Sequence, residues 1–328
     1  MDAVLITGCC GFIGHKVTKI LLEKGATVIG IDNMNDYYDP RLKDWRLNLL
    51  QNTSRWHGQF IFYRYDVGDF KCVKTIFSNH AIDGVINLAA RAGVRASVED
   101  PWSYIDTNLN GTLNLLECCK DYNVKKFVFA STSSVYGDNI EIPFKVSDIT
   151  DHPLAPYAAS KKSAEVLCYS YYYLYGIDTI VPRFFTVYGP AGRPDMSYFR
   201  FIKNIDMGLP ITVFGDGGQK RDFTYIDDIA EGTIKCLASS GYEIFNLGND
   251  EPVELMHLIK LIEEQLGKHT AEIHWRPAHP ADVRATWADI SKSREKLSWS
   301  PSVSIEDGVR ETIRWYKANR DFVRDLKD

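Results

Sequence analysis

A tyrosine and a lysine, Tyr157 and Lys161, stand four residues apart directly after Pro156, in a stretch that favours a helix. Positions four apart share one face of a helix, so both side chains are expected to point into the same space. A free tyrosine has a pKa of about 10 and is a poor base at neutral pH, but a neighbouring ammonium favours the phenolate. The pair therefore predicts a general base that takes a proton from a hydroxyl group. The simpler interpretation is two exposed helix residues without a catalytic role.

A run of hydroxyl residues, Ser131-Thr132-Ser133-Ser134, follows an expected strand at 126–130. Ligands bind at the carboxyl ends of the strands in open α/β sheets. These hydroxyls are therefore candidates for bonding a polyhydroxylated ligand and for assisting proton transfer. A turn whose hydroxyls bond its own backbone is the alternative.

A glycine-rich turn directly follows the first expected strand and leads into a helix that is expected to begin near Gly14. Glycine lets the backbone approach a pyrophosphate, and a helix N-terminus supplies N–H donors and a positive dipole end. The residues expected at the pyrophosphate are Gly8, Gly11, Phe12, Ile13 and Gly14. The spacing GxxGxxG is a weak signal by itself, because such turns are common after strands.

Asp32 closes the second expected strand, at about the distance from the turn where an acid binds the adenosine ribose. A carboxylate there repels a 2′-phosphate, so the sequence favours NAD over NADP as the cofactor. A turn residue at a strand end is the alternative for Asp32. Further cofactor-binding candidates, after the next strands and on a later helix, are Asn33, Asp66, Val67, Leu88, Ala89, Ala90 and Asn108.

Short β-branched runs alternate with helical patterns through the first half of the chain. The expected strands are residues 4–6, 27–31, 60–63, 84–88, 126–130, 178–181 and 243–246, and the late helices are 253–266 and 306–317. Apolar runs flanked by helices indicate a parallel sheet that is covered on both faces. We expect an α/β fold, namely a doubly wound parallel Rossmann sheet with a smaller mixed α/β substrate domain. The NAD-binding domain would comprise residues 1–183 and a return segment at about 233–250, and the smaller substrate-binding domain residues 184–232 and 251–328.

The composition excludes several classes of protein. The 328 residues carry a net charge of −5 without a basic stripe, so nucleic-acid binding is not expected. The chain shows neither a signal peptide nor an apolar run long enough for a membrane span, which predicts a cytoplasmic protein without membrane contact. The seven cysteines lack a CxxC pair and zinc-type spacing, so we expect reduced thiols and no metal site.

Further motifs have a specific order and spacing along the chain. They are Asp32-Asn33 followed by Asn35-Asp36-Tyr37-Tyr38, Arg91-Ala92-Gly93-Val94-Arg95, Arg183-Phe184-Phe185-Thr186-Val187-Tyr188-Gly189-Pro190, Arg193-Pro194-Asp195-Met196, Lys220-Arg221-Asp222-Phe223-Thr224-Tyr225-Ile226-Asp227-Asp228 and Pro252-Val253-Glu254-Leu255-Met256. With the features above, they resemble the extended short-chain dehydrogenase/reductase superfamily over nearly the whole chain, and within it the UDP-glucuronate 4-epimerases. The resemblance implies reversible C4 epimerisation of UDP-glucuronate to UDP-galacturonate through a 4-keto intermediate, with tightly bound NAD.

The resemblance also implies roles for particular residues. It makes Tyr157 the base, Lys161 its support and a ligand of the nicotinamide ribose, and Thr132 the hydroxyl that bridges to the sugar. The implied contacts to the UDP-sugar are Ser133, Ser134 and Arg193 at the sugar carboxylate, Arg221 at the diphosphate, His279, Asp282 and Arg284 at the UDP end, and Thr186 and Arg95 on the substrate side.

Ser133-Ser134, at the end of the expected strand, bear on which related activity the chain has. The resemblance implies that 4,6-dehydratases carry Asp-Glu there and that UDP-glucuronate decarboxylases carry a Glu in place of Ser134, which argues against both. UDP-glucose/UDP-galactose 4-epimerases share the whole machinery and stay open. An oxidoreductase with net NAD(H) turnover and a dinucleotide-binding regulator are the other classes considered. Three positions depart from the family pattern: Cys9-Cys10 in the glycine turn, Arg91, where a neutral or His-like residue is expected, and His279, where the resemblance implies Gln or Arg near the UDP.

Residues 108–122 and 157–175 are expected to form helices where this superfamily builds a four-helix dimer interface. The aromatic run 169–175 fits burial in such an interface, and it fits ordinary core packing as well. We therefore expect a homodimer.

Overall fold

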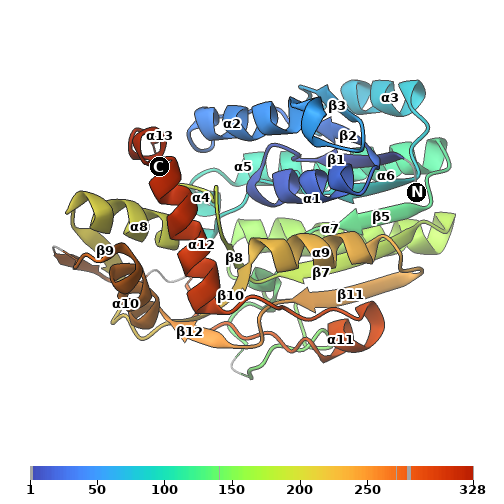
Figure 1. The fold of residues 1–328 in the computed structure, drawn as a ribbon. Helices are drawn as coiled ribbons and strands as arrows, with labels where there is room; N and C mark the ends of the chain where they lie inside the picture. The colour runs from blue at the N-terminus through green and yellow to red at the C-terminus, as the bar shows by residue number, and fades with distance from the viewer. Residues whose placement is uncertain (1–2, 140, 271, 279–281, 328) are drawn as a thin grey trace.

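The computed structural model describes residues 3–139, 141–270, 272–278 and 282–327. A large sheet with helices on both faces lies beside a smaller part of the molecule (Figure 1). The strands of the large sheet are β1 (Ala3–Thr7), β2 (Thr27–Ile31), β3 (Phe60–Tyr63), β4 (Gly84–Asn87), β5 (Lys126–Phe129), β6 (Ser131–Thr132), β7 (Asp178–Phe184) and β11 (Tyr242–Leu247). All their pairings are parallel. The predicted doubly wound α/β fold is confirmed.

The strand order is β11-β7-β5-β4-β1-β2-β3, with the short β6 beside β7. The chain builds the sheet outward from β1 through β2 and β3, and then restarts at β4 on the other side of β1. This reversal between β1 and β4 is the point where ligands bind in open parallel sheets.

Side chains that alternate along the strands enter two hydrophobic cores. Val4 and Ile6 pack into one core, and Leu5 between them packs into the other. The first core is covered by α1 (Phe12–Glu23), α2 (Pro40–Gln51) and α9 (Ile226–Cys236). The second is covered by α3 (Phe70–Asn79), α6 (Gly111–Asp121) and α7 (Pro156–Tyr175). A sheet buried on both faces explains why its strands are nearly continuous apolar runs.

Short helical segments connect β4 to α6 and β6 to α7. They are α4 (Val94–Glu99), α5 (Pro101–Tyr104), the π-helical η2 (Ile105–Asn110) and the 3₁₀ turn η3 (Ser133–Tyr136), with a further 3₁₀ turn η1 (Thr53–Arg55) before β3. The helix predicted from residue 108 therefore continues an earlier helical segment. Its π turn has i→i+5 geometry, which occurs often at functional sites.

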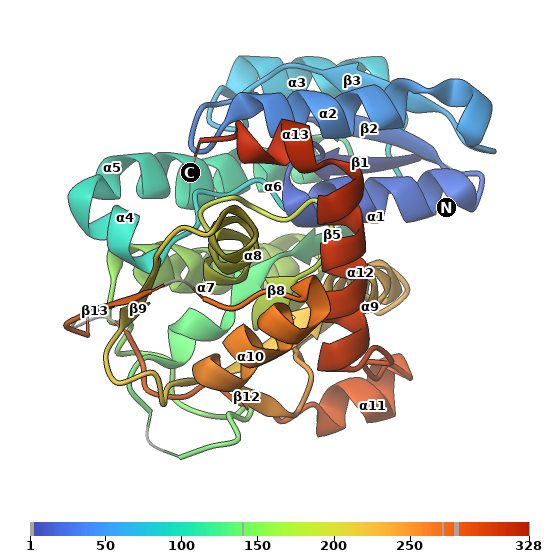
Figure 2. The ribbon, with the colours of Figure 1, turned by 60° about the vertical axis from the view of Figure 1, so that its left-hand side comes forward.

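The smaller part contains two small sheets and a group of helices, of which α8, α10 and α12 lie together (Figure 2). Its elements are β8 (Thr186–Tyr188), β10 (Lys220–Tyr225) and β12 (Pro252–Glu254), the parallel pair β9 (Ile211–Phe214) and β13 (Ile273–Arg276), and α8 (Ser197–Met207), α10 (Leu255–Leu266), α11 (Ser291–Leu297), α12 (Ile305–Ala318) and α13 (Arg320–Arg324). The helix predicted for 253–266 begins at Leu255 instead, because the preceding residues pair antiparallel with β10.

No helix in the described ranges is both long enough and apolar enough to cross a membrane. The seven cysteines are all free thiols. Among the described residues, no cluster of three or more His, Cys, Asp or Glu side chains is arranged to hold a metal ion.

Candidate active site

The glycine-rich turn joins β1 to α1 at the carboxyl edge of the sheet. Gly8 has φ +67°, and a Cβ added there would lie 2.9 Å from the backbone nitrogen of Ala89. A Cβ on Gly14 would lie 2.0 Å from the carbonyl oxygen of Gly8, so the tight packing of the turn requires both glycines. Gly11 is the N-cap residue and α1 begins at Phe12, earlier than predicted. No side chain caps this helix, so the N–H groups of its first turn point at the space where an anion would bind.

Asp32 is buried directly after β2. Its carboxylate accepts hydrogen bonds from the backbone nitrogens of Cys10 at 3.1 Å and Met34 at 2.9 Å, which ties it to the glycine turn. Lys43 Nζ lies 3.9 Å from Asp32 Oδ1, and the fully buried Arg46 donates to the Cys10 carbonyl oxygen at 3.0 Å. Sequence reasoning missed both cations, because a single Lys or Arg on a helix is usually solvated.

The remaining cofactor-binding candidates at this edge of the sheet are Asn33, Asp66, Val67, Leu88, Ala89 and Ala90. Asn33 Nδ2 donates to Asp66 Oδ2 at 2.7 Å, so the ends of β2 and β3 are joined. The backbone nitrogens of Leu88 and Ala89 donate to Thr7 Oγ1 at 3.1 and 3.0 Å, which joins the ends of β4 and β1. Thr7 was not predicted, although a Thr at the last position of a buried strand is a usable signal.

Asn108 lies in the π turn η2, and its side chain is fully buried. Its amide bonds the backbone of Arg91, accepting from N at 2.9 Å and donating to O at 3.0 Å. It also donates to Ser160 Oγ at 2.9 Å, and Ser160 Oγ donates to the Tyr157 carbonyl oxygen at 2.8 Å. The side chain of Asn108 thus fixes the loop after β4 to the start of α7.

Tyr157 and Lys161 lie on the first two turns of α7. Lys161 is 2% exposed and its Nζ donates to the Ala130 carbonyl oxygen at 2.7 Å. Burial lowers the pKa of Lys161 to about 7. Burial raises the pKa of Tyr157, while a hydrogen bond with Thr132 and the charge of Arg193 oppose that rise. The protein cation that favours the phenolate is therefore Arg193, whereas the spacing had predicted this effect for Lys161.

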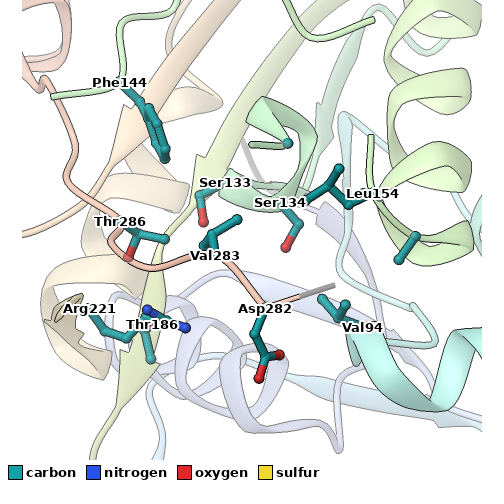
Figure 3. A pocket seen from close by; sticks show the side chains of 13 residues that line it. Val94, Ser133, Ser134, Phe144, Leu154, Thr186, Arg221, Asp282, Val283 and Thr286 are labelled. Carbon is teal, nitrogen blue, oxygen red and sulfur yellow. The ribbon is translucent and has the colours of Figure 1, made fainter. Parts of the chain in front are cut away.

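Thr132 ends β6 and caps the short turn η3. Its hydroxyl accepts from Ser134 N at 3.2 Å and donates to Ser134 Oγ at 3.2 Å, so the turn does bond its own backbone. Ser133 and Ser134 also line a cavity of about 180 Å³, together with Thr186 and Arg221 (Figure 3). The hydroxyl run thus has two roles. Thr132 bonds the backbone of the turn, and Ser133 and Ser134 face a space that a ligand can enter.

At the same cavity, Arg221 and Asp282 face each other from β10 and from the loop before α11 (Figure 3). Arg95 Nη2 pairs with Asp282 Oδ2 at 2.5 Å, and the Arg95 guanidinium carbon lies 3.8 Å from the centre of the Phe214 ring. Burial lowers the pKa of Arg221. The charge of Asp282 raises this pKa, and the charge of Arg95 lowers it further. Two arginines around one carboxylate leave a net positive charge where a diphosphate is expected.

The structure does not place four of the predicted substrate residues in the lining of this cavity, and Arg95 and Arg193 are two of them. Arg284 is exposed, and its side chain is not among those that line the cavity. His279 lies outside the described residues.

Arg193 lies between α7 and the β2–α2 connection. Its Nε and Nη2 donate to the two carboxylate oxygens of Asp195 at 3.0 and 2.5 Å. Burial acts to lower the pKa of Arg193. The charge and hydrogen bonds of Asp195 act in the opposite direction, and the net result is a raised pKa. Its guanidinium carbon also lies 5.3 Å from the centre of the Tyr37 ring. The sequence predicted Arg193 but neither Asp195 as its partner nor Tyr37 as its support.

A second pair, between an arginine and a glutamate, fixes the catalytic helix α7 to the large sheet. Glu165, one turn beyond Lys161, accepts from Arg183 Nε at 3.0 Å and Nη2 at 2.8 Å. Ser131 Oγ donates to the same carboxylate at 2.6 Å. This pair joins α7, β6 and β7, and therefore holds the hydroxyl run against Tyr157.

The doubly wound sheet, the glycine turn with its acid after β2, and the Tyr-x-x-x-Lys helix define a short-chain dehydrogenase/reductase. Within that class the chain belongs to the family whose model is described as GDP-mannose 4,6-dehydratase, which matches residues 5–312.

Individual relatives are named as epimerases. The chain is 52% identical to a UDP-glucuronate 4-epimerase of Thermodesulfobacterium geofontis, over 100% of both chains. It is similar to the UDP-glucuronic acid 4-epimerase of Bacillus cereus, solved with UDP-glucuronic acid and NAD, with 37% identity, a TM-score of 0.89 and coverage of 96% and 99%. It is equally similar in fold to the UDP-glucose 4-epimerase of Thermotoga maritima, solved with UDP-glucose, with 33% identity, a TM-score of 0.89 and coverage of 97% and 99%. The fold therefore does not distinguish a uronate from a neutral hexose.

Proposed function

We propose that this protein is an NAD-dependent epimerase that inverts C4 of UDP-glucuronate to give UDP-galacturonate, and the reverse. The observation that carries this proposal is the position of the Arg193 guanidinium, whose carbon lies 5.3 Å from the centre of the Tyr37 ring and whose charge acts on the base Tyr157. A planar guanidinium matches the two oxygens of a carboxylate, and a neutral hexose needs no cation at this position. The relatives named UDP-glucuronate 4-epimerases support the same substrate.

The residues of the site fit NAD. The uncapped N-terminus of α1 offers N–H groups to the pyrophosphate, and Asp32 offers carboxylate oxygens to the adenosine ribose. The nicotinamide end of NAD would lie between two features of the site. One is the backbone after β4, which the bond from Ala89 N to Thr7 fixes, and the other is Lys161 on α7. When bound, NAD supplies the reversible uptake and return of hydride at C4.

The protein's own groups then move one proton. Tyr157 takes the proton of the C4 hydroxyl and later returns it to the oxygen of the turned 4-keto sugar, so that no proton is gained or lost over the cycle. Thr132, which bonds Tyr157, is positioned to bridge to the same hydroxyl. Arg221 and Asp282 would hold the UDP end while the hexose turns.

A 4-keto uronate is a β-keto acid, so it loses carbon dioxide readily once its carboxylate aligns with the developing enolate. We propose that Thr132, Ser133, Ser134 and Arg193 hold the carboxylate out of that alignment. The absence of a carboxylate side chain at positions 133–134 supports an epimerase over the dehydratase after which the family model is named.

Proton NMR of the purified protein with UDP-glucuronate and no added nicotinamide cofactor tests the proposal. Signals of UDP-galacturonate that grow to a fixed ratio are expected. If only UDP-glucose is inverted, the protein is a neutral-sugar epimerase, and a UDP-pentose signal means that the carboxylate is not protected. A net change in absorbance at 340 nm would instead indicate an oxidoreductase.

The base is tested by Tyr157→Phe, which keeps the ring and removes the titrating hydroxyl. Epimerisation should fall by about 10²–10⁴-fold while UDP-glucuronate still binds. The rate is followed by NMR and binding by calorimetry. A variant that keeps more than a tenth of the wild-type rate would remove Tyr157 from the mechanism.

We further propose the division into an NAD-binding part, residues 1–183 with a return segment, and a UDP-sugar-binding part formed by the rest. The return of β11 to the large sheet supports this division. Helix α9 packs on α1, which supports a start of the return segment near residue 226 instead of 233. Limited proteolysis with and without UDP would test which segments are protected together.

We also propose a homodimer formed through the helical residues 108–122 and 157–175, and the exposure of Trp102 supports adding α5 to this interface. Large apolar side chains that are at least half exposed on these helices are Trp102, Val166, Tyr169, Tyr173 and Leu174. Tyr173→Glu should give a monomer by light scattering at micromolar concentration, and a monomeric wild type would contradict the proposal. A cytoplasmic location, supported by seven free thiols, is proposed as well and is tested by cell fractionation.

A further inference from the structure

Tyr37 belongs to the connection between β2 and α2, and side-chain bonds fix this connection in place. Asn33 Oδ1 accepts from Asn35 N at 3.1 Å, and Asn35 Oδ1 accepts from Tyr37 N at 3.2 Å. Lys43 Nζ donates to the same Asn35 oxygen at 2.9 Å. The connection starts at Asp32, so a rigid segment leads from the proposed adenosine ribose contact to Tyr37.

The hydroxyl of Tyr37 docks on the loop after β4, next to the catalytic tyrosine. It donates to the Ala92 carbonyl oxygen, which also accepts from Tyr104 Oη at 3.3 Å. The Tyr104 ring meets the Tyr157 ring edge-on, with centres 6.0 Å apart. A Cβ on Gly93 would lie 2.5 Å from Tyr37 Oη, so the loop is shaped to receive this phenol. Tyr37 is therefore held against the site by both its backbone and its hydroxyl.

The ring of Tyr37 contacts two guanidinium groups. The guanidinium carbons of Arg193 and Arg91 lie 5.3 and 5.5 Å from the ring centre. Asp195 accepts from Nε and from one N–H of Nη2 of Arg193, so the N–H groups of Nη1 and the second N–H of Nη2 can bond a ligand. Arg91 is the residue that departs from the family pattern, so this chain adds a second cation to the same ring.

An aromatic face stabilises a guanidinium without consuming its N–H donors. It also fixes the plane of the group, and a guanidinium in a fixed plane discriminates by geometry as well as by charge. Two like charges on one ring repel each other, and an incoming carboxylate relieves that repulsion. A neutral hydroxymethyl group gains nothing from either guanidinium.

We propose that Tyr37 is a positioning residue that sets the preference for a uronate, because its ring holds the guanidinium groups of Arg193 and Arg91 where the C6 carboxylate binds. This inference rests on the proposed function. It assigns no chemical step to Tyr37, which acts through the two arginines.

Binding measurements in a Tyr157→Phe background, where turnover is suppressed, test the proposal. Dissociation constants of UDP-glucuronate and UDP-glucose are measured by calorimetry, and their ratio gives the preference for the uronate. Tyr37→Leu should lower this preference by roughly threefold to thirtyfold through weaker uronate binding alone, the range of a partly desolvated cation–π contact. Tyr37→Phe keeps the ring and should change the preference by less than about threefold. Equal weakening of both ligands would indicate a merely structural role and overturn the proposal.

Fluorinated phenylalanines at position 37 provide a second test that does not depend on the folding of Tyr37→Leu. Progressive fluorination keeps the shape of the ring and weakens its attraction for cations. The preference for the uronate should fall stepwise along the series, and a flat series overturns the proposal. The wild-type NMR assay separates the two failures. A wild type that inverts only UDP-glucose overturns the proposed function and this inference together, whereas a uronate epimerase with a flat series overturns this inference alone.

Discussion

Two arginine–carboxylate pairs near the catalytic helix have the same fork geometry and different surroundings. Arg183 and Glu165 make bonds of 3.0 and 2.8 Å and are 2% and 1% exposed. Arg193 and Asp195 make bonds of 3.0 and 2.5 Å, and their side chains are 19% and 24% exposed. The first pair joins α7 to two strands, and the second lies beside Tyr157.

The difference in exposure separates two uses of the same chemical contact. A sealed pair cannot exchange its partner, because either ion alone would be buried without compensation. A pair that water reaches can share its cation with another carboxylate at little cost. The sealed pair is therefore a support of the active site, and the accessible pair is a recognition element.

Breaking the sealed pair should have the largest effect on stability. Arg183→Met removes both guanidinium bonds from the buried Glu165, whose other cation, Lys162 Nζ, lies 4.0 Å away, and should lower the free energy of unfolding by about 3–5 kcal/mol. Arg193→Met should lower it by less, because the side chain of Asp195 keeps 24% of its surface exposed. Urea denaturation followed by circular dichroism measures both. Equal losses would show that exposure does not separate the two pairs.

Breaking the accessible pair should affect catalysis instead. Arg193→Ala should lower kcat/KM for UDP-glucuronate by about 100-fold, which corresponds to about 2.7 kcal/mol, or increase a UDP-pentose by-product. Product analysis by NMR checks both outcomes. Arg310→Ala, which removes an exposed arginine of α12, is the control. Unchanged kinetics and products for Arg193→Ala would contradict its assignment to the carboxylate.

Lys161 extends the comparison to a buried lysine whose Nζ donates to a carbonyl oxygen, that of Ala130, instead of a carboxylate. Its pKa is about 7 in the folded protein, against about 10.4 in an unfolded chain. Between these values the unfolded chain binds the additional proton, so Lys161 contributes a slope of up to about 1.4 kcal/mol per unit by which stability rises with pH. Buried thiols such as Cys119 and Cys168 contribute the opposite sign above about pH 8, because burial raises their pKa values. The slope that Lys161 contributes is therefore the difference between the wild type and a variant without this lysine.

Lys161→Met should remove this slope and increase the free energy of unfolding at pH 7 by about 2 kcal/mol, while activity is lost. Urea denaturation at pH 7, 8 and 9 checks the prediction. Lys162→Met, on the neighbouring and partly exposed lysine, should keep the slope. A slope in Lys161→Met equal to that of the wild type would mean that Lys161 is charged in the folded protein.

His15 gives the smallest expected effect. Burial, with Arg46, Lys16 and Lys19 nearby, lowers its pKa to about 3, against about 6.5 when unfolded. Stability should therefore fall as the pH drops below 6.5, by about 1.4 kcal/mol by pH 5.5. His15→Gln should reduce this loss and His257→Gln, on an exposed histidine, should not. Thermal melts at pH 7.5 and 5.5 measure the difference, and identical melts for the two variants would contradict a neutral His15 in the folded protein.

Local patterns were sufficient to predict the fold and one half of the site. The glycine turn, Asp32 and the Tyr157–Lys161 spacing each express a contact between residues close in sequence or at consecutive strand ends. The expected strands, including the late return at 243–246, were found in the large sheet. The boundaries were less accurate, since the strand β12 at the start of an expected helix is held only by its pairing with β10.

The rest of the site depends on contacts between distant segments. Nothing in its neighbours marks Arg46 as buried, because its partners at Ala191 and Gly192 come from another part of the chain. The same holds for Tyr37, whose two arginines come from the loop after β4 and the loop before α8.

The sequence by itself determined the parallel sheet, the dinucleotide-type turn and the helix that carries the base, because these follow from periodicity and from residue types at short spacing. Only the tertiary structure decided which cation lies beside Tyr157 and which arginine pair is sealed. The residue type determines which side chains can carry a charge. The burial of such a side chain and its partner, which determine what that charge does, arise when β2, β4, α7 and the segment before α8 meet at one edge of the sheet.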